Sequence, residues 1–302
     1  MKVRIGFGLG VRTTLNDASF GDVVDTLEGL GFDSLWLSER LGGEAPDPVA
    51  ALAYAAGRTE QLKLGTSVVV LPGRNPVVLA KELATVDRLS GGRLLPAFGL
   101  GAADPHEQQA FGVSRGERAP WFDEVLPLLR RLWTEESVDH HGPRFHYEGL
   151  RVLPKPLQQP PDVWLGGYAP SELRRVGRLG DGWLPSFVTP DDAAAGRATI
   201  EQVAAEHGRA IDPEHFGVLV PYATGAVPEA MAAALARRRP GVDLADIVPT
   251  GLEGLAALIE RFVAVGTSKF VALPLTEPEA TLTDHLEALA AAVLPLQQVL
   301  SR

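Results

Sequence analysis

The chain has 302 residues and a formal net charge of −10. Its 45% hydrophobic and 22% charged residues are typical of a globular protein with a sizeable core, and the acidic balance argues against nucleic acid, whose binding depends on a basic surface. The sequence has no cysteine, which excludes disulfides, thiolate nucleophiles and cysteine-ligated metals within it.

Short apolar runs that predict strands alternate with segments of helical periodicity in the first half of the chain. The third of these helices ends at the glycine pair 91–92, a strong signal for a helix terminus. Strands are expected at 2–9, 33–39, 62–71 and from 94 to about 99, and helices around 24–30, 48–59, 76–90, 105–113 and 119–134.

The same alternation continues in the second half. A polar stretch at 139–149 is typical of an exposed hairpin, and an insertion at 225–250 carries one helix rich in Ala and Arg. Strands are expected at 161–167, 182–187, 216–224 and 268–275, and helices at 170–180, 191–207, 252–266 and 281–300.

Eight apolar strands alternating with helices favour parallel βαβ units. Eight such units in this length predict an α/β fold, a (β/α)8 TIM barrel with an insertion near 225–250, formed as one domain over residues 1–302. An open doubly wound sheet is the alternative, because counting strands does not prove closure.

No apolar stretch approaches the roughly 20 residues of a membrane span. The N-terminal apolar run is short for a signal peptide and contains Arg12. We therefore expect a cytoplasmic protein without a membrane partner.

The barrel hypothesis also predicts where the chemistry lies, because active sites of such barrels are built at the C-terminal ends of the strands. Ser and charged residues follow one strand, and glycines follow two others. The predicted ends are 38–40, 67–69, 99–101 and 166–169, followed by 185–186, 222 and 273–274.

Four blocks of sequence, taken together, carry a resemblance to a known family. They are FDSLWLSER (32–40), LKLGTSVVVLPGRNPVVLAKELATVDRLSGGRL (62–94), FGLGAADPHEQQAFGV (98–113) and PDVWLGGYAPSELRRVGRLGDGW (161–183). The chain resembles the luciferase-like monooxygenase superfamily, and within it the oxidoreductases that use the deazaflavin coenzyme F-420 (F420). The likeness is strong over residues 3–187 and looser in the last barrel units.

The resemblance implies a cofactor site in the mouth of the barrel. It implies a non-prolyl cis peptide bond between Ser67 and Val68, in a bulge that supports the central ring of the flavin. Gly99 and Gly101 would line the ring, and they lack the spacing of a dinucleotide-binding fingerprint. Leu100 departs from the small hydroxyl residue that deazaflavin relatives often carry there.

A second loop is the better candidate for a phosphate site. Gly166 and Gly167 follow a strand, and Tyr168 and Ala169 lead into a helix that starts near residue 170. Backbone N–H groups at the start of a helix attract anions, so residues 166–169 are expected to hold the cofactor phosphate. The arginines at 174, 175 and 178 are expected either to help hold an acidic tail or to form a solvated helix face.

Glu39 and Arg40 end the second strand and are the candidate catalytic residues. Several deazaflavin dehydrogenases have an acid followed by histidine here. Glu39 keeps the acid, where it can also contact the cofactor, but a guanidinium stays protonated and cannot act as a base. Arg40 therefore puts alcohol oxidation in doubt, although it can stabilise negative charge.

These observations predict an F420-dependent oxidoreductase that transfers a hydride to or from a small organic substrate. An FMN-dependent monooxygenase and a non-catalytic flavin-binding barrel are the alternatives, since FMN and F420 share the ribityl phosphate. We expect no metal site, because His140, His141 and His146 lie in the predicted hairpin. The resemblance also implies a homodimer formed through residues 48–57 and 76–90.

Overall fold

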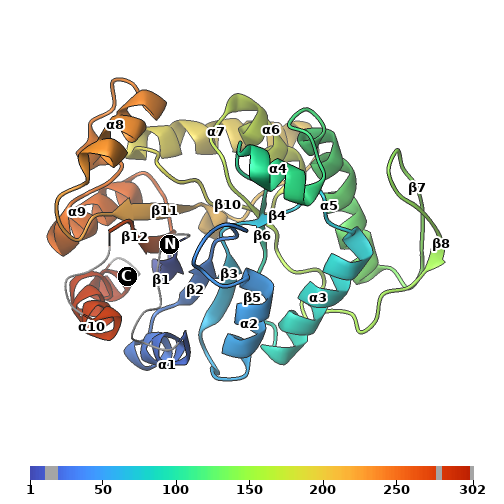
Figure 1. Ribbon diagram of the computed structural model, residues 1–302, viewed down its shortest axis with the longest axis horizontal. Coiled ribbons are helices and arrows are strands. Elements are labelled where there is room, and N and C mark those ends of the chain that lie inside the picture. The colour runs from blue at the N-terminus through green and yellow to red at the C-terminus, as the bar shows by residue number, and fades with distance from the viewer. Residues whose placement is uncertain (11–19, 277–280, 300–302) are drawn as a thin grey trace.

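The computed structural model describes residues 1–10, 20–276 and 281–299. Within these ranges, parallel strands form a central wall that helices surround (Figure 1). The strands are β1 (Arg4–Leu9), β2 (Ser34–Leu37), β3 (Lys63–Thr66), β4 (Val69–Val70), β5 (Leu94–Leu95), β6 (Ala97–Gly99), β7 (Val138–His141), β8 (His146–Leu150), β9 (Trp164–Leu165), β10 (Gly182–Trp183), β11 (Gly217–Tyr222) and β12 (Lys269–Pro274).

The helices follow the strands in the alternation that the sequence predicts. They are α1 (Phe20–Leu30), α2 (Pro48–Ala56), α3 (Pro76–Leu89), α4 (Pro105–Phe111), α5 (Arg118–Thr134), α6 (Pro170–Leu179), α7 (Pro190–Glu206), α8 (Glu229–Arg238), α9 (Gly251–Ala264), α10 (Leu282–Val293) and α11 (Pro295–Val299), with short 3-10 turns η1 (Pro213–His215) and η2 (Leu244–Asp246). Across the described ranges, no helix is long and apolar enough to cross a membrane.

The strands close into a barrel. One sheet has the order β11-β12-β1-β2-β3-β5 and the other β10-β9-β6-β4, and every pair in them is parallel. β3 and β4 are successive parts of one predicted strand, and β5 and β6 are successive parts of the next. Each of these two strands therefore has one part in each sheet, and the two sheets join there. Bridges from Trp183 to Phe216 and from Ser186 to Leu219 join β10 to β11. The predicted (β/α)8 barrel is confirmed over the open sheet.

Two predicted strands are interrupted. The third breaks between β3 and β4 at Ser67 and Val68, and the fourth breaks between β5 and β6 at Pro96, which has no N–H for the ladder. The predicted hairpin is the antiparallel pair β7–β8, which projects from one side of the molecule (Figure 1). The insertion contains α8 and η2, as the sequence indicates.

Several helix starts follow from local chemistry. Proline occupies the first helical position of α2, α3, α4, α6 and α7, where its missing N–H costs no hydrogen bond. The side chains of Asp47, Asn75, Asp104 and Thr189 precede four of these prolines and accept N–H groups of the first turn. These caps fix where each helix begins relative to the strand before it.

Two tryptophans fill the barrel interior. Trp36 of β2 and Trp164 of β9 are almost completely buried, and their rings meet edge to face with centroids 6.4 Å apart. Glycine makes room for each ring, because a Cβ at Gly65 would lie 2.3 Å from Trp36 and one at Gly182 would lie 2.5 Å from Trp164. The interior is thus packed with side chains and is not a pore.

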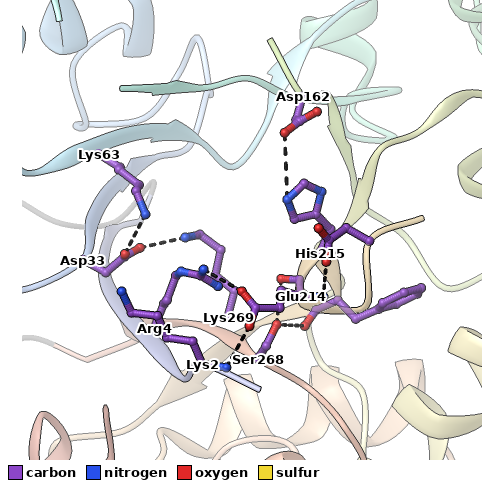
Figure 2. Close-up of polar contacts among 11 residues, drawn as sticks. Lys2, Arg4, Asp33, Lys63, Asp162, Glu214, His215, Ser268 and Lys269 are labelled. Atoms are coloured by element: carbon purple, nitrogen blue, oxygen red, sulfur yellow. Dashed lines mark hydrogen bonds and ion pairs between the residues drawn. The ribbon is translucent and has the colours of Figure 1, made fainter. Parts of the chain in front are cut away.

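A charged cluster lies at the N-terminal ends of the strands (Figure 2). The Asp33 carboxylate, just before β2, accepts hydrogen bonds from the Nζ atoms of Lys63 at 2.9 Å and Lys269 at 2.7 Å. The side chains of Asp33 and Lys269 are 13% and 4% exposed, so this charge pair is largely buried. Burial alone would raise the pKa of Asp33, but the charges of Lys269 and Lys63 lower it to about 2.

We expect Asp33→Asn to destabilise the fold by about 3–5 kcal/mol, because it leaves the ammonium of Lys269 buried without a counter-charge. Lys63→Gln is the matched control. It removes the partly exposed cation and should cost no more than about 1 kcal/mol. Urea unfolding measures both, and equal effects would contradict the assignment.

The same contact predicts a pH dependence. Because the pKa of Asp33 falls from 3.8 to about 2 on folding, its contribution to stability is complete above pH 3.8 and is lost as pH drops towards 2. Asp33→Asn should therefore remove part of the acid sensitivity of the free energy of unfolding between pH 4 and 2.

Candidate functional site

A cleft of about 420 Å³ opens at the C-terminal ends of the strands, on the opposite end of the barrel from the Asp33 cluster. Most of the residues singled out from the sequence line it: Glu39, Arg40, Ser67, Val68, Gly99, Leu100, Gly101, Gly166 and Gly167. Tyr168 and Ala169 are not among the lining residues. The cleft has the size of a small-molecule or cofactor site.

The back wall of the cleft is apolar and centred on Val68. The peptide bond between Ser67 and Val68 is cis, as the sequence resemblance implied. A Cβ at Gly99 would lie 2.5 Å from one methyl of Val68, and a Cβ at Gly166 would lie 3.8 Å from the other. The absence of a side chain at Gly99 therefore lets Val68 cover that position. Val68 itself lines the cleft.

Glycine is required at position 101 for a different reason. The backbone there is left-handed, with φ +83°, a conformation that favours glycine. Arg118 holds the segment around it by donating from one guanidinium nitrogen to the carbonyl oxygens of Leu100 at 3.2 Å, Gly101 at 2.9 Å and Ala102 at 2.8 Å. The rim of the cleft at this loop is thus fixed by a side chain from α5.

Glu39 also lines the cleft and is held by buried hydrogen bonds. Its side chain is 3% exposed, and its carboxylate accepts the N–H of Val70 at 2.7 Å and the guanidinium of Arg74. Burial raises the pKa of Glu39, against the opposing effects of Arg74 and the Val70 N–H. Its hydrogen bond with Val70 connects the end of β2 to β4.

Arg40 lies at the rim and is paired with two acids. Its guanidinium is 3.1 Å from Asp104, which caps α4, and 3.6 Å from Glu107. Glu107 is buried and also accepts the N–H of Leu41 at 2.9 Å. The Glu107 carboxylate thus links α4 to residues 40–41.

The loop chosen from the sequence as the phosphate site already contains an anion. The N–H groups of Tyr168 and Ala169 both donate to one carboxylate oxygen of Glu172, each at 2.9 Å. Glu172 belongs to the first turn of α6, and this arrangement is the reciprocal half of a capping box. A phosphate at these two N–H groups would therefore meet a carboxylate of the same sign.

The arginines of α6 are engaged with Asp123 of α5. Arg175 is 2.7 Å from one Asp123 oxygen and Arg178 is 3.0 Å from the other. Arg175 is buried and borders the cleft, while Arg174 is exposed and absent from its lining. Of the three, only Arg175 is placed to influence a bound molecule.

Sequence reasoning missed Glu172 and Arg238, which line the cleft, and Arg118, which holds the loop at its rim. The capping box left a local signal, since Glu172 stands three residues after Ala169 at a helix start. Arg118 and Arg238 left none, because Arg118 reaches the rim loop from the start of α5 and Arg238 reaches the cleft from the insertion. Their positions depend on how distant segments pack.

Comparison with known proteins identifies the family of this chain and relatives named for coenzyme F420. The family model for luciferase-like monooxygenase matches residues 6–272 of this chain. A protein of Mycobacterium tuberculosis that carries the name of a coenzyme F420-dependent oxidoreductase is 28% identical over 232 residues, covering 72% of this chain and 65% of the relative. An F420-dependent glucose-6-phosphate dehydrogenase of Intrasporangium calvum is 34% identical over 170 residues, covering 52% and 50%. The chain thus spans only half to two thirds of these relatives.

Solved structures extend the likeness of the fold to almost the whole chain. The oxygenating constituent of 3,6-diketocamphane monooxygenase from Pseudomonas putida, solved in complex with FMN, superposes with a TM-score of 0.75. The match covers 98% of this chain and 99% of that one at 17% identity. At this identity the likeness concerns the barrel alone.

The buried Glu39–Arg74 contact gives a testable prediction. Arg74→Met should destabilise the protein by about 3–5 kcal/mol, because it leaves the Glu39 carboxylate buried without its cation. Arg58→Met, which disrupts the exposed pair with Asp25, is the control and should have a much smaller effect. Urea unfolding measures the free energy of unfolding of both variants. Equal losses of stability would contradict the larger effect expected for the buried Glu39–Arg74 contact.

Proposed function

The chain belongs to the luciferase-like monooxygenase family, and from this premise we propose that it is an oxidoreductase that uses F420 to transfer a hydride to or from a small organic substrate. The support for F420 comes from the relatives that carry it in their names, and the support for a cofactor slot comes from the geometry of the cleft.

The observation that carries the proposal is the wall formed by Val68 with Gly99 and Gly166. Gly99 and Gly166 carry no side chains beside the methyl groups of Val68, which leaves room for a flat aromatic ring to lie against this part of the lining. A cleft of about 420 Å³ is large enough for the ring system. The ring therefore fits, whereas a phosphate at Tyr168 and Ala169 does not fit while Glu172 occupies them.

When bound, a deazaflavin supplies a carbon that accepts or donates a hydride. The chain's own part is to hold one face of the ring against Val68, to keep water from that face and to align the substrate on the other. Ser67, Gly99, Leu100 and Gly101 are proposed to border the ring.

The proposed catalytic pair would lie at the reacting end. Glu39 is held by Arg74, and Arg40 by Asp104, so both charges are already compensated. No histidine is found among the described residues that line the cleft. This arrangement favours hydride transfer without a protein base, with Arg40 stabilising negative charge on the substrate or the reduced ring.

FMN with oxygen is a second candidate, supported by the fold shared with an FMN-bound monooxygenase. A non-catalytic flavin-binding barrel is the remaining alternative. The wall at Val68 accepts the ring of FMN as readily as that of F420, so these possibilities are separated by binding and turnover.

Titration of the purified protein with F420 and with FMN, followed by its tryptophan fluorescence, tests the proposal. We expect F420 to bind with a Kd of about 1–10 μM or tighter and FMN to bind at least about 10-fold more weakly. Val68→Lys, which places a charged chain on the wall, should abolish F420 binding.

The outcomes separate the three candidates. Preference for FMN would replace the F420 proposal with the oxygen-dependent one. Tight F420 binding without reduction or oxidation of any screened substrate would favour the non-catalytic barrel. Binding of neither cofactor would overturn the enzyme proposal for this cleft.

We further propose a homodimer formed by α2 and α3. A groove of about 400 Å³ lies between these helices, with Lys81 and Glu82 in its lining. Apolar side chains are exposed beside it: Tyr54 is 50%, Val78 54% and Leu89 60% exposed. Opposite charges next to apolar surface suit a self-complementary contact.

Val78→Arg should convert the dimer into a monomer, because it places a charge in the apolar part of this contact. Leu41→Arg, at a similarly exposed position outside α2 and α3, should leave the mass unchanged. Sedimentation equilibrium measures the mass of each. A wild-type monomer at 50 μM would contradict the proposal.

A further inference from the structure

The three arginines that line the cleft differ in the charges around them. Arg40 is paired with Asp104, and Arg175 with Asp123. In the part of the chain that the structure describes, Arg238 has no acidic partner, and its guanidinium instead lies 5.5 Å from the ring centroid of Phe187. Among the described residues, Arg238 is therefore the lining arginine without an acidic partner, whereas Arg175 shares Asp123 with Arg178.

Arg238 is positioned by the residue that follows it. Arg239 donates to the carbonyl oxygen of Phe187 at 2.5 Å, pairs with Asp192 and lies 5.4 Å from the ring centroid of Tyr168. These contacts fasten the end of α8 to the segments that precede α6 and α7. The end of α8 is thus held against the barrel loops. This position brings the Arg238 side chain to the edge of the cleft.

The backbone next to Arg238 is unusual as well. Phe187 has φ +57°, the left-handed region that a bulky residue rarely adopts. Its carbonyl oxygen accepts from Arg239 while its ring lies beneath Arg238. Such residues cluster at functional sites, where the surrounding structure enforces them. Arg238 is exposed, and Phe187, which its guanidinium faces, is held in this conformation by the hydrogen bond from Arg239.

The other possible anion site on the cleft is closed. Glu172 already accepts the N–H groups of Tyr168 and Ala169, and a Cβ at Gly167 would lie 2.5 Å from the Glu172 carboxylate, which is folded over this loop. A ligand phosphate would have to displace a carboxylate to reach these donors. At Arg238 it meets an uncompensated guanidinium instead.

We propose that Arg238 of the insertion binds the phosphate of the ligand, and that the Tyr168–Ala169 N–H pair does not. The inference rests on the proposed function for the identity of the ligand. The phosphate belongs either to the ribityl chain of F420 or to a phosphorylated substrate, and both would use the same charge-assisted, bidentate contact with the guanidinium. The insertion is then part of the binding site.

The test compares F420 with its precursor that has the same ring and ribityl chain but no phosphate. Arg238→Gln should weaken F420 binding at least about tenfold and change binding of the precursor less than about twofold. Arg237→Gln is the matched control, because Arg237 is the exposed neighbour on α8 and does not line the cleft. Thermal unfolding confirms that each variant is folded.

Glu172→Gln provides an independent check, because glutamine can still accept both N–H groups but carries no charge. Under the proposal it changes the ratio of F420 to precursor affinity less than about threefold. A rise of about tenfold or more would show that the N–H pair takes the phosphate once the carboxylate is neutral, and would overturn the assignment to Arg238.

Further experiments distinguish a phosphate of F420 from a phosphate of the substrate. They also distinguish failure of this inference from failure of the proposed function. If F420 binds Arg238→Gln as tightly as wild type, inorganic phosphate is titrated onto protein saturated with the precursor. Saturable binding that Arg238→Gln abolishes supports a substrate phosphate, and its persistence in the variant overturns the inference. If neither deazaflavin binds wild type, the proposed function fails by itself. The inference is then decided by whether inorganic pyrophosphate raises the melting temperature of wild type but not of Arg238→Gln.

Discussion

The packing of Trp36 against Trp164 across the barrel is the constraint on which the rest of the structure depends. Two indole rings occupy the interior where opposite strands face each other, and Gly65 and Gly182 leave the room that they need. Leu184 and Leu219 belong to the same apolar cluster and also line the cleft. The cleft therefore has a solid floor, and a bound molecule is confined to the ends of the strands.

Charge is divided between the two ends of this core. At the N-terminal end, Asp33 compensates two lysines and stabilises the start of the barrel strands (Figure 2). At the C-terminal end, Glu39 and Arg40 are also compensated, and their partners come from the loops that form the wall and the rim. The ion pairs at the cleft thus stabilise the loops that form it. Val68 provides an apolar part of its lining.

The insertion is the part of the chain that gives the cleft its remaining positive charge. Its helix α8 is fastened at its C-terminal end by Arg239, while the adjacent Arg238 borders the cleft without an acidic partner in the described ranges. Because Glu172 already accepts the N–H groups of Tyr168 and Ala169, the proposed recognition of a ligand phosphate depends on a segment outside the repeating βα units.

The sequence by itself determined the alternation of strands and helices, because apolar periodicity, proline starts and glycine ends are local properties. It also determined the rim residues, since the ends of parallel strands meet at one face once the barrel is assumed, and the cis bond at Ser67 followed from the family resemblance. It could not decide the partner of each charge. Arg74 reaches Glu39 across 35 positions and Arg118 reaches Gly101 across 17, and Arg238 meets the cleft only because Arg239 is fastened to Asp192, 47 positions away. These contacts depend on the distances between packed elements, and only the tertiary structure sets those distances.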